Sequence, residues 1–211
     1  MVSPQASYPR DSRPGNNSAR SKGSGDGRCY ARRGKVKWKW QAIDSKNCPA
    51  PLGGERTGRN PTDRGKRGSK LHLLVAKRGA PLAAFSSGAN QHDKTVAVSL
   101  VSSLVVERPE REQQLCADKA YDATDFRDYL VLEGYPPQIK SYPRGSKNPE
   151  TGQLGLGESG QSARRWLVER TLSWLAKHRS IRTRWSKRAG NWLAFVQLAC
   201  SHILFNLVVS G

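Results

Sequence analysis

The sequence predicts an α/β fold in which a mixed sheet is flanked by helices. Three observations lead to this prediction. Near the start of the regular pattern, apolar residues alternate with polar ones, which indicates a strand. Two further apolar runs follow, joined by a short turn. Beyond them, segments with helical spacing alternate with short apolar runs, so that helices and strands follow one another along the rest of the chain.

The chain is expected to divide into a disordered low-complexity tail, residues 1–34, and one folded domain, residues 35–211. The first 27 residues are rich in Ser, Pro, Gly and Arg and contain almost nothing to bury. A chain of 211 residues suits one domain of ordinary size with a core of its own.

The first three strands are expected to be consecutive and antiparallel. Residues 36–44 alternate with period two, and this strand ends at Asp44. A basic loop interrupted by Pro and Gly spans residues 45–70, and residues 71–87 predict a hairpin with its turn at Lys77 to Pro81. The residues expected on one face of the first strand are Val36, Trp38, Trp40 and Ala42.

Helices and strands alternate after the hairpin. Residues 92–107 predict a helix, with His92 and Asp93 acting as a start cap rather than a catalytic pair. A short apolar strand then ends at Asp118. Next come a helix closed by Gly134 and a fifth strand over residues 138–143.

The C-terminal part is predicted to be helical. A polar Gly-rich loop, residues 143–161, precedes a long basic helix over residues 162–185. Its GLGESG stretch fits a dinucleotide-binding pattern formally, but no suitable strand precedes it. The apolar stretch 192–209 contains polar side chains and predicts a helix buried in the domain rather than a membrane span. The residues spaced to face a core on the long helix are Trp166, Leu172 and Leu175.

The charge distribution indicates a polyanionic partner. The chain has 36 Lys and Arg against 17 Asp and Glu, a net charge of +19. Two cationic segments, Arg28–Arg78 and the part after Glu169, flank an acidic middle, which favours a groove for nucleic acid. Ribosomal, chromatin and membrane-surface roles share such a charge. The four cysteines form no C-x-x-C pair, so a zinc site is not expected and a reduced cytosolic protein is the default.

Two acidic residues close strands that can be neighbours. If the first and fourth strands pair, Asp44 and Asp118 meet at one end of the sheet, and Glu169 on the long helix completes a set. Grouped carboxylates repel one another unless a cation lies between them, and a hard divalent ion such as magnesium prefers oxygen ligands. Taken singly, each acid is most simply a turn, cap or solvated helix residue, so only their joint order favours a site.

Five segments in a fixed order carry a family resemblance: residues 42–75, 88–93, 115–122, 166–185 and 191–200. In this order they resemble the blocks of bacterial insertion-sequence transposases of the DDE class, which have a ribonuclease-H-like catalytic domain. The resemblance runs from about Lys35 to the C-terminus. It implies metal-dependent cleavage and transfer of DNA strands at element ends.

The resemblance also implies the site. Its catalytic and metal-binding residues match Asp44, Asp118 and Glu169, which would hold Mg²⁺ or Mn²⁺, with two ions expected. The family signature places Tyr, Arg and Lys around the Glu. Arg165 matches the Arg, whereas Ser162 stands for the Tyr and Ala176 for the Lys.

Basic residues around these acids are expected to contact DNA. Lys177 is the candidate replacement for the missing Lys, because it lies on a similar side of the helix. Trp185 is a candidate for stacking on bases, whereas Trp166 and Trp174 are expected in the core. The expected DNA-binding set is Arg56, Arg59, Arg64, Lys66, Arg67, Lys70, Lys119, Arg165, Lys177, Arg182 and Arg184.

The expected partners are double-stranded DNA, both element ends and target, and further copies of the chain in the DNA complex. Only about 43 residues precede Asp44, too few for the helical end-recognition domain usual in such transposases. A separate N-terminal product could supply it, in a nucleoid-associated cytoplasmic setting without a membrane. Three alternatives stay open: a nuclease without strand transfer, an inactive transposase relic, and a basic nucleic-acid-binding protein.

Overall fold

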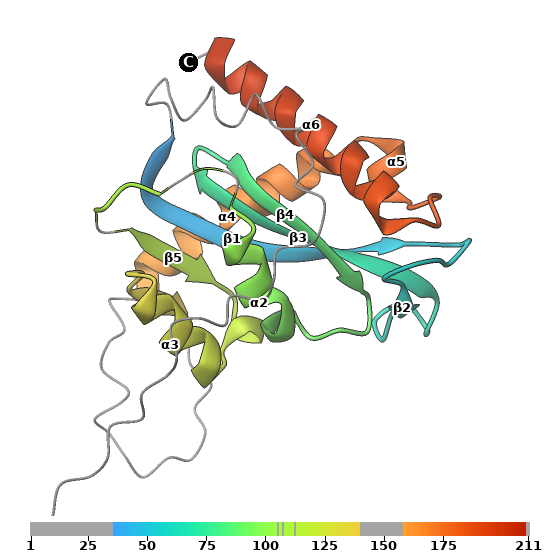
Figure 1. Ribbon diagram of the computed structural model, residues 1–211, viewed down its shortest axis with the longest axis horizontal. Coiled ribbons are helices and arrows are strands. Elements are labelled where there is room, and N and C mark those ends of the chain that lie inside the picture. The colour runs from blue at the N-terminus through green and yellow to red at the C-terminus, as the bar shows by residue number, and fades with distance from the viewer. Residues whose placement is uncertain (1–35, 105, 107, 112, 140–157, 210–211) are drawn as a thin grey trace, which may run out of the picture.

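A computed structural model describes residues 36–104, 106, 108–111, 113–139 and 158–209 (Figure 1). The predicted tail, residues 1–34, lies outside the described residues. So do residues 140–143 of the predicted fifth strand and residues 143–157 of the Gly-rich loop. The prediction of a loop up to residue 161 is wrong at its end, because residues 158–160, the second half of the GLGESG stretch, are already helical.

The described strands form one mixed sheet with helices on both sides. Its order is β2-β3-β1-β5-β6, and β4 also pairs with β3. The β1–β3 and β3–β4 pairs are antiparallel, whereas β1–β5 and β5–β6 are parallel. The predicted α/β class is therefore confirmed. In chain order the elements are β1 (Lys37–Pro49), β2 (Gly58–Arg59), β3 (Arg67–Lys77), β4 (Ala80–Gly88), α2 (Asp93–Ser102), β5 (Gln114–Ala117), the 3₁₀ helix η1 (Lys119–Tyr121), α3 (Thr124–Leu132), β6 (Pro137–Ile139), α4 (Glu158–Leu175), α5 (Arg179–Arg182) and α6 (Ala189–Val209).

Two cores cover the two faces of this sheet. The first core lies under α2 and α3, and the second lies under α4 and α5, while α6 runs along β4 and contributes to both. Figure 1 shows α2 in front of the sheet and α4 behind it. The first core includes Val36, Trp38, Ile43, Leu74, Leu100, Leu115, Phe126 and Leu130. The second includes Ala42, Leu71, Leu73, Val75, Val168, Leu172, Trp192 and Val196.

The first strand differs from its prediction in two ways. Its register shifts between Lys37 and Gln41, so Trp38 packs in the first core and Ala42 in the second. The prediction that these residues share one face of the strand is therefore wrong, because after a bulge the side chains that pointed to one face of the sheet point to the other. The strand also continues past Asp44 to Pro49, because β3 begins early enough to pair with its whole second half.

The long C-terminal helix predicted for residues 162–185 is also wrong. Helix α4 ends at Leu175, where Lys177 and His178 donate backbone hydrogen bonds three residues back, which tightens the last turn. Only the short α5 follows, and the backbone N–H of Arg184 donates to Pro49 O at 2.8 Å. This contact between distant segments draws the chain away from the helical path.

The burial predictions for the C-terminal helices are partly confirmed. Leu172 and Leu175 are buried as expected, but Trp166 is 48% exposed. Helix α6 is not buried on all sides, because Leu198 and Phe205 point outward. By length and composition α6 could cross a membrane, which is weak evidence, since core helices pass the same test. The predicted cap at Gly134 is confirmed by its φ of 73° and the two hydrogen bonds of a Schellman motif.

Candidate active site

The sheet brings Asp44 and Asp118 together. Residues Trp40–Ala42 of β1 pair in parallel with Gln114–Cys116 of β5, so Asp118, directly after β5, comes beside Asp44. Each carboxylate accepts a hydrogen bond from the next backbone N–H, 2.8 Å from Ser45 N and 2.7 Å from Lys119 N. These local bonds fix the direction of both side chains.

Helix α4 adds Glu169 and Arg165 to the two aspartates. Val168 is fully buried in the second core, which holds this turn of α4 against the sheet. Arg165 Nη1 lies 3.1 Å from Asp118 Oδ1, and Arg165 Nη2 lies 3.1 Å from Glu169 Oε1. The guanidinium of Arg165 therefore bridges an acid of the sheet and an acid of the helix.

The electrostatics of Asp44 show that these groups share one environment. Burial raises the pKa of Asp44 from 3.8 to about 6, while the Ser45 N–H and the charge of Arg165 act in the opposite direction. The negative charges of Glu169 and Asp118 raise the pKa of Asp44 further. All three predicted acids and Arg165 thus lie within electrostatic reach of one another.

Tyr121, in η1, belongs to the first core and lies within electrostatic reach of Asp44 and Asp118. Burial raises the pKa of its phenol well above 10, and the charges of Asp93, Asp44 and Asp118 add to the rise. The ring packs against Phe126, with centroids 6.4 Å apart. Asp122, the next acid along the chain, instead pairs with Arg127 at 2.7 Å.

The donor set suits a divalent metal ion by its chemistry. Three carboxylates offer the oxygen ligands that Mg²⁺ and Mn²⁺ take. Within the part of the chain that the structure describes, however, no three His, Cys, Asp or Glu side chains are gathered closely enough to hold an ion. Arg165 provides the positive charge between Asp118 and Glu169.

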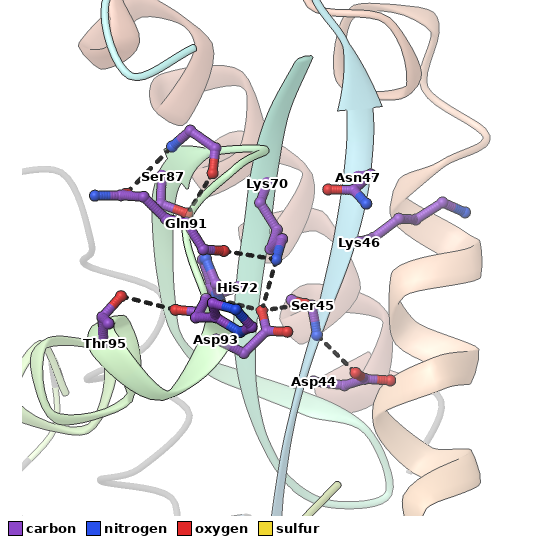
Figure 2. A network of polar contacts seen from close by, with 12 residues as sticks. Asp44, Ser45, Lys46, Asn47, Lys70, His72, Ser87, Gln91, Asp93 and Thr95 are labelled. Atoms are coloured by element: carbon purple, nitrogen blue, oxygen red, sulfur yellow. Dashed lines mark hydrogen bonds and ion pairs between the residues drawn. The ribbon is translucent and has the colours of Figure 1, made fainter. Parts of the chain in front are cut away.

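A second polar network lies on the other face of β1, where Ser45 points away from Asp44 (Figure 2). Ser45 Oγ donates to Asp93 Oδ1 at 2.7 Å. The same carboxylate oxygen lies 3.3 Å from Lys70 Nζ and 3.6 Å from His72 Nδ1. The predicted cap at Asp93 is therefore wrong. The N-cap position is His92, without a side-chain cap bond, and Asp93 faces the sheet.

His72 extends this network to a third strand. Its ring is fully buried, and Nε2 lies 2.7 Å from Ser87 Oγ of β4. Burial lowers the pKa of His72 to about 4, outweighing the opposing charge of Asp93, so the ring is neutral at pH 7. The network ties α2, β3 and β4 to the residue beside Asp44. The signal in the sequence that could have indicated this network was the presence of two polar residues, Lys70 and His72, at alternate positions of an otherwise apolar strand.

Comparison with known proteins identifies the family. Residues 40–204 match the sequence profile of the family described as "Transposase DDE domain". A Burkholderia cepacia protein named as a transposase for insertion sequence element IS402 is 36% identical over 170 residues, which cover 78% of this chain and 74% of that protein. The chain belongs to the DDE transposase family.

A solved structure of a piggyBac transposase synaptic complex with hairpin DNA is similar in fold. The TM-score is 0.52 at 12% identity, over 82% of this transposase. The match covers 47% of the piggyBac chain, so the present chain spans about half of its length. The likeness confirms the predicted ribonuclease-H-like fold.

Most of the basic residues predicted to contact DNA are exposed on the transposase. Arg165 is engaged by Asp118 and Glu169, and Lys119 is half-buried beside Asp118. Lys70 is largely buried, with its ammonium held by Asp93 and Gln91 O. Because its ammonium already contacts these two groups, the structure does not support a contact between Lys70 and DNA. The exposed members are Arg56, Arg59, Arg64, Lys66, Arg67, Lys177 and Arg182.

Arg184 is placed in the interior of the transposase. Its side chain is 0% exposed and donates to Ser69 Oγ at 2.6 Å, Lys187 O at 2.8 Å and Ser186 O at 2.9 Å. Its guanidinium carbon lies 5.6 Å from the ring centroid of Trp192. Its position contradicts the prediction that Arg184 contacts DNA, because the guanidinium reaches no solvent. Arg184 instead ties the segment before α6 to β3.

Proposed function

We propose that this transposase cuts and joins DNA strands at the ends of an insertion sequence, using Asp44, Asp118 and Glu169 with divalent metal ions. The observation that carries the proposal is the position of three carboxylates from β1, the end of β5 and α4: Arg165 contacts Asp118 and Glu169, and Asp44 lies within electrostatic reach of all three residues. They come from separate elements of a fold that the family shares.

The three carboxylates would hold Mg²⁺ or Mn²⁺, with two ions proposed. Bound there, the ions supply the charge that activates an attacking water or 3′-hydroxyl and stabilises the leaving oxygen. The raised pKa of Asp44 supports a ligand role, because burial disfavours its ionised form even with the charge of Arg165 nearby. A bound cation favours its ionised form.

Arg165 has two roles in this proposal. It aligns Glu169 with Asp118 through paired hydrogen bonds, so that the helix carboxylate stays over the sheet. A guanidinium also matches the geometry of a phosphate, and Arg165 contacts two of the three acids. We propose that it contacts the phosphate at which the strand is cut.

The exposed basic residues would hold the DNA on either side of this site. Five of them lie between Arg56 and Arg67, where β2 folds back on the start of β3, and two follow α4. Contacts to phosphates fix the position of DNA without reading its sequence. We therefore propose weak binding of double-stranded DNA without sequence preference, with affinity that falls steeply as salt rises.

Recognition of the element ends would then come from elsewhere. We propose that a separate N-terminal DNA-binding product supplies it and that the chain works as an oligomer in the DNA complex. The setting would be the nucleoid of a bacterial cytoplasm.

A joining assay separates transposition from simple cleavage. A pre-cut element end and a target plasmid are incubated with Mg²⁺ and the chain, with and without the N-terminal product, and joined strands are measured. We expect joining by the wild type and by Asp125→Asn, and none by Asp118→Asn. Asp125 is a matched control, because it is an exposed acid seven residues further on, in the first turn of α3.

Cleavage without joining would assign a nuclease instead. Joining by Asp118→Asn at the wild-type rate would contradict the proposed site. A folded chain that neither cuts nor joins, even with the N-terminal product, would identify an inactive relic.

A further inference from the structure

Helix α4 carries an aromatic and cationic stripe beside its catalytic Glu169. Trp166, Arg170 and Trp174 recur every four residues and so share one face of the helix. The guanidinium carbon of Arg170 lies 4.5 Å from the ring centroid of Trp166 and 4.7 Å from that of Trp174. Trp166 is nevertheless half-exposed, so this stripe is not part of a closed core.

The stripe forms one wall of a pocket of about 510 Å³. Its lining also includes Trp40 of β1 and Lys77 and Arg78 at the β3–β4 turn. The charged residues at this pocket are Lys77, Arg78 and Arg170, and no acid is among the described residues that line it. The pocket is thus both aromatic and positively charged.

Arg170 is held in place by the hairpin turn. Its Nη2 donates to Arg78 O at 2.7 Å, and its Nε has no hydrogen-bond partner among the described residues. Thr171, next to it, donates to Gly79 O at 3.0 Å. The turn and the helix therefore form a fixed frame around the pocket, with the positive charges of Lys77 and Arg78 at its exposed side.

The pocket lies next to the catalytic residues along the helix. Trp166 directly follows Arg165, and Arg170 directly follows Glu169. At 100° per residue, Trp166 and Arg170 project about 60° and 100° around the helix axis from Glu169. A DNA strand that passes Arg165 would need only a short further path to reach the pocket.

We propose that this pocket binds an unpaired nucleotide of the DNA strand on which the active site works. The base would stack on Trp166 and its phosphates would lie beside Lys77 and Arg78, since single strands are bound by aromatic faces in positive grooves. An apolar partner would leave three cations desolvated without counter-charge. This inference rests on the proposed function for the identity of the DNA strand.

A binding assay without catalysis tests the pocket. A labelled short single strand and the same strand with one abasic position are titrated with protein in EDTA, and fluorescence anisotropy gives both affinities. We expect the wild type to prefer the complete strand by roughly 5- to 150-fold, the range for one stacked base. Trp166→Ala should lose this preference by weakening only the complete strand, and Trp166→Phe should keep most of it.

Phe195→Ala is the matched control, because Phe195 is 47% exposed, close to the 48% of Trp166, but does not line the pocket. It should keep the wild-type preference between the two strands. Equal affinities for both strands in the wild type would overturn the inference. A preference for the complete strand that survives Trp166→Ala would also overturn it. So would an equal loss of affinity for both strands in Trp166→Ala, because such a loss would reflect a change in folding or charge and not the loss of base stacking. Binding of polyglutamate in place of the oligonucleotide would assign an acidic peptide and overturn it too.

The proposed function and the pocket can fail separately. Asp118→Asn should retain the preference for the complete strand, because the assay contains no free metal ion and measures binding without cleavage. If the wild type joins DNA but shows no preference, only the pocket is wrong. If the preference depends on Trp166 but no cutting or joining occurs with the N-terminal product present, only the proposed function is wrong.

Discussion

Truncating Arg184 to Ala should destabilise the fold strongly. The buried side chain donates three hydrogen bonds of 2.6 to 2.9 Å. A hydrogen bond from a charged group contributes about 1.5–3 kcal/mol, so three would give roughly 4.5–9 kcal/mol if nothing relaxed. Relief of the buried charge and entry of water recover part of this. We therefore expect a loss of about 3–5 kcal/mol, comparable to that for breaking a buried ion pair.

Urea unfolding followed by tryptophan fluorescence measures this loss. Trp192 is buried beside Arg184 and should report on the transition. Arg182→Ala is the matched control, because Arg182 is exposed two residues earlier and should change stability by no more than about 0.5 kcal/mol. The control should instead bind DNA more weakly, with a smaller salt dependence.

Two results would refute this account of Arg184. One is an unfolding midpoint for Arg184→Ala equal to that of the wild type. The other is a variant of unchanged stability that has lost DNA affinity, which would return Arg184 to the DNA-binding set.

Three further perturbations test the site and its frame. Asp93→Ala should fold but cleave DNA about 10- to 100-fold more slowly in a single-turnover assay, as is typical when a residue that orients a metal ligand is removed. The reason is that Asp93 holds Ser45, the residue next to Asp44. An unchanged cleavage rate would contradict this role. The raised pKa of Asp44 means that its contribution favours folding below pH 3.8 and is lost as pH rises through about 6. Asp44→Asn should thus be more stable than the wild type at neutral pH without metal ions, and urea titrations across this range should show the advantage vanish toward pH 3.8. Gly54→Ala should lower the melting temperature more than Gly65→Ala. Both glycines have a positive φ, but only at Gly54 would an added Cβ meet the backbone of Lys187. Equal decreases in melting temperature would refute the close approach of Gly54 to Lys187.

The sequence was most informative where one local pattern decides the structure. The period-two strand, the hairpin and the short apolar strand before Asp118 follow from alternation, turn residues and an apolar run. Asp44 and Asp118 meet because the first and fourth predicted strands do pair, which the prediction had to assume. The bulge near Lys37 was not predictable, because it depends on the pairing with β3 rather than on the strand itself.

Long-range contacts explain the other differences. Arg184 looks like any surface arginine in a basic segment, and its burial depends on acceptors at Ser69 and in the turn after α5. Asp93 stands where a helix cap is common, yet Ser45 and Lys70 draw its carboxylate to the sheet. In both cases partners from other elements decide the direction of a side chain that its own segment leaves open.

Metal rescue of a cysteine variant tests the central claim most directly. In Asp118→Cys one proposed carboxylate ligand becomes a thiolate, which binds Mg²⁺ poorly and softer ions better. Cleavage of the element's flanking DNA is measured for this variant and the wild type, each with Mg²⁺ and with Mn²⁺. We predict that the wild type cuts with either ion and that Asp118→Cys cuts only with Mn²⁺. Equal cleavage by the variant with both ions would contradict a metal-binding role for Asp118.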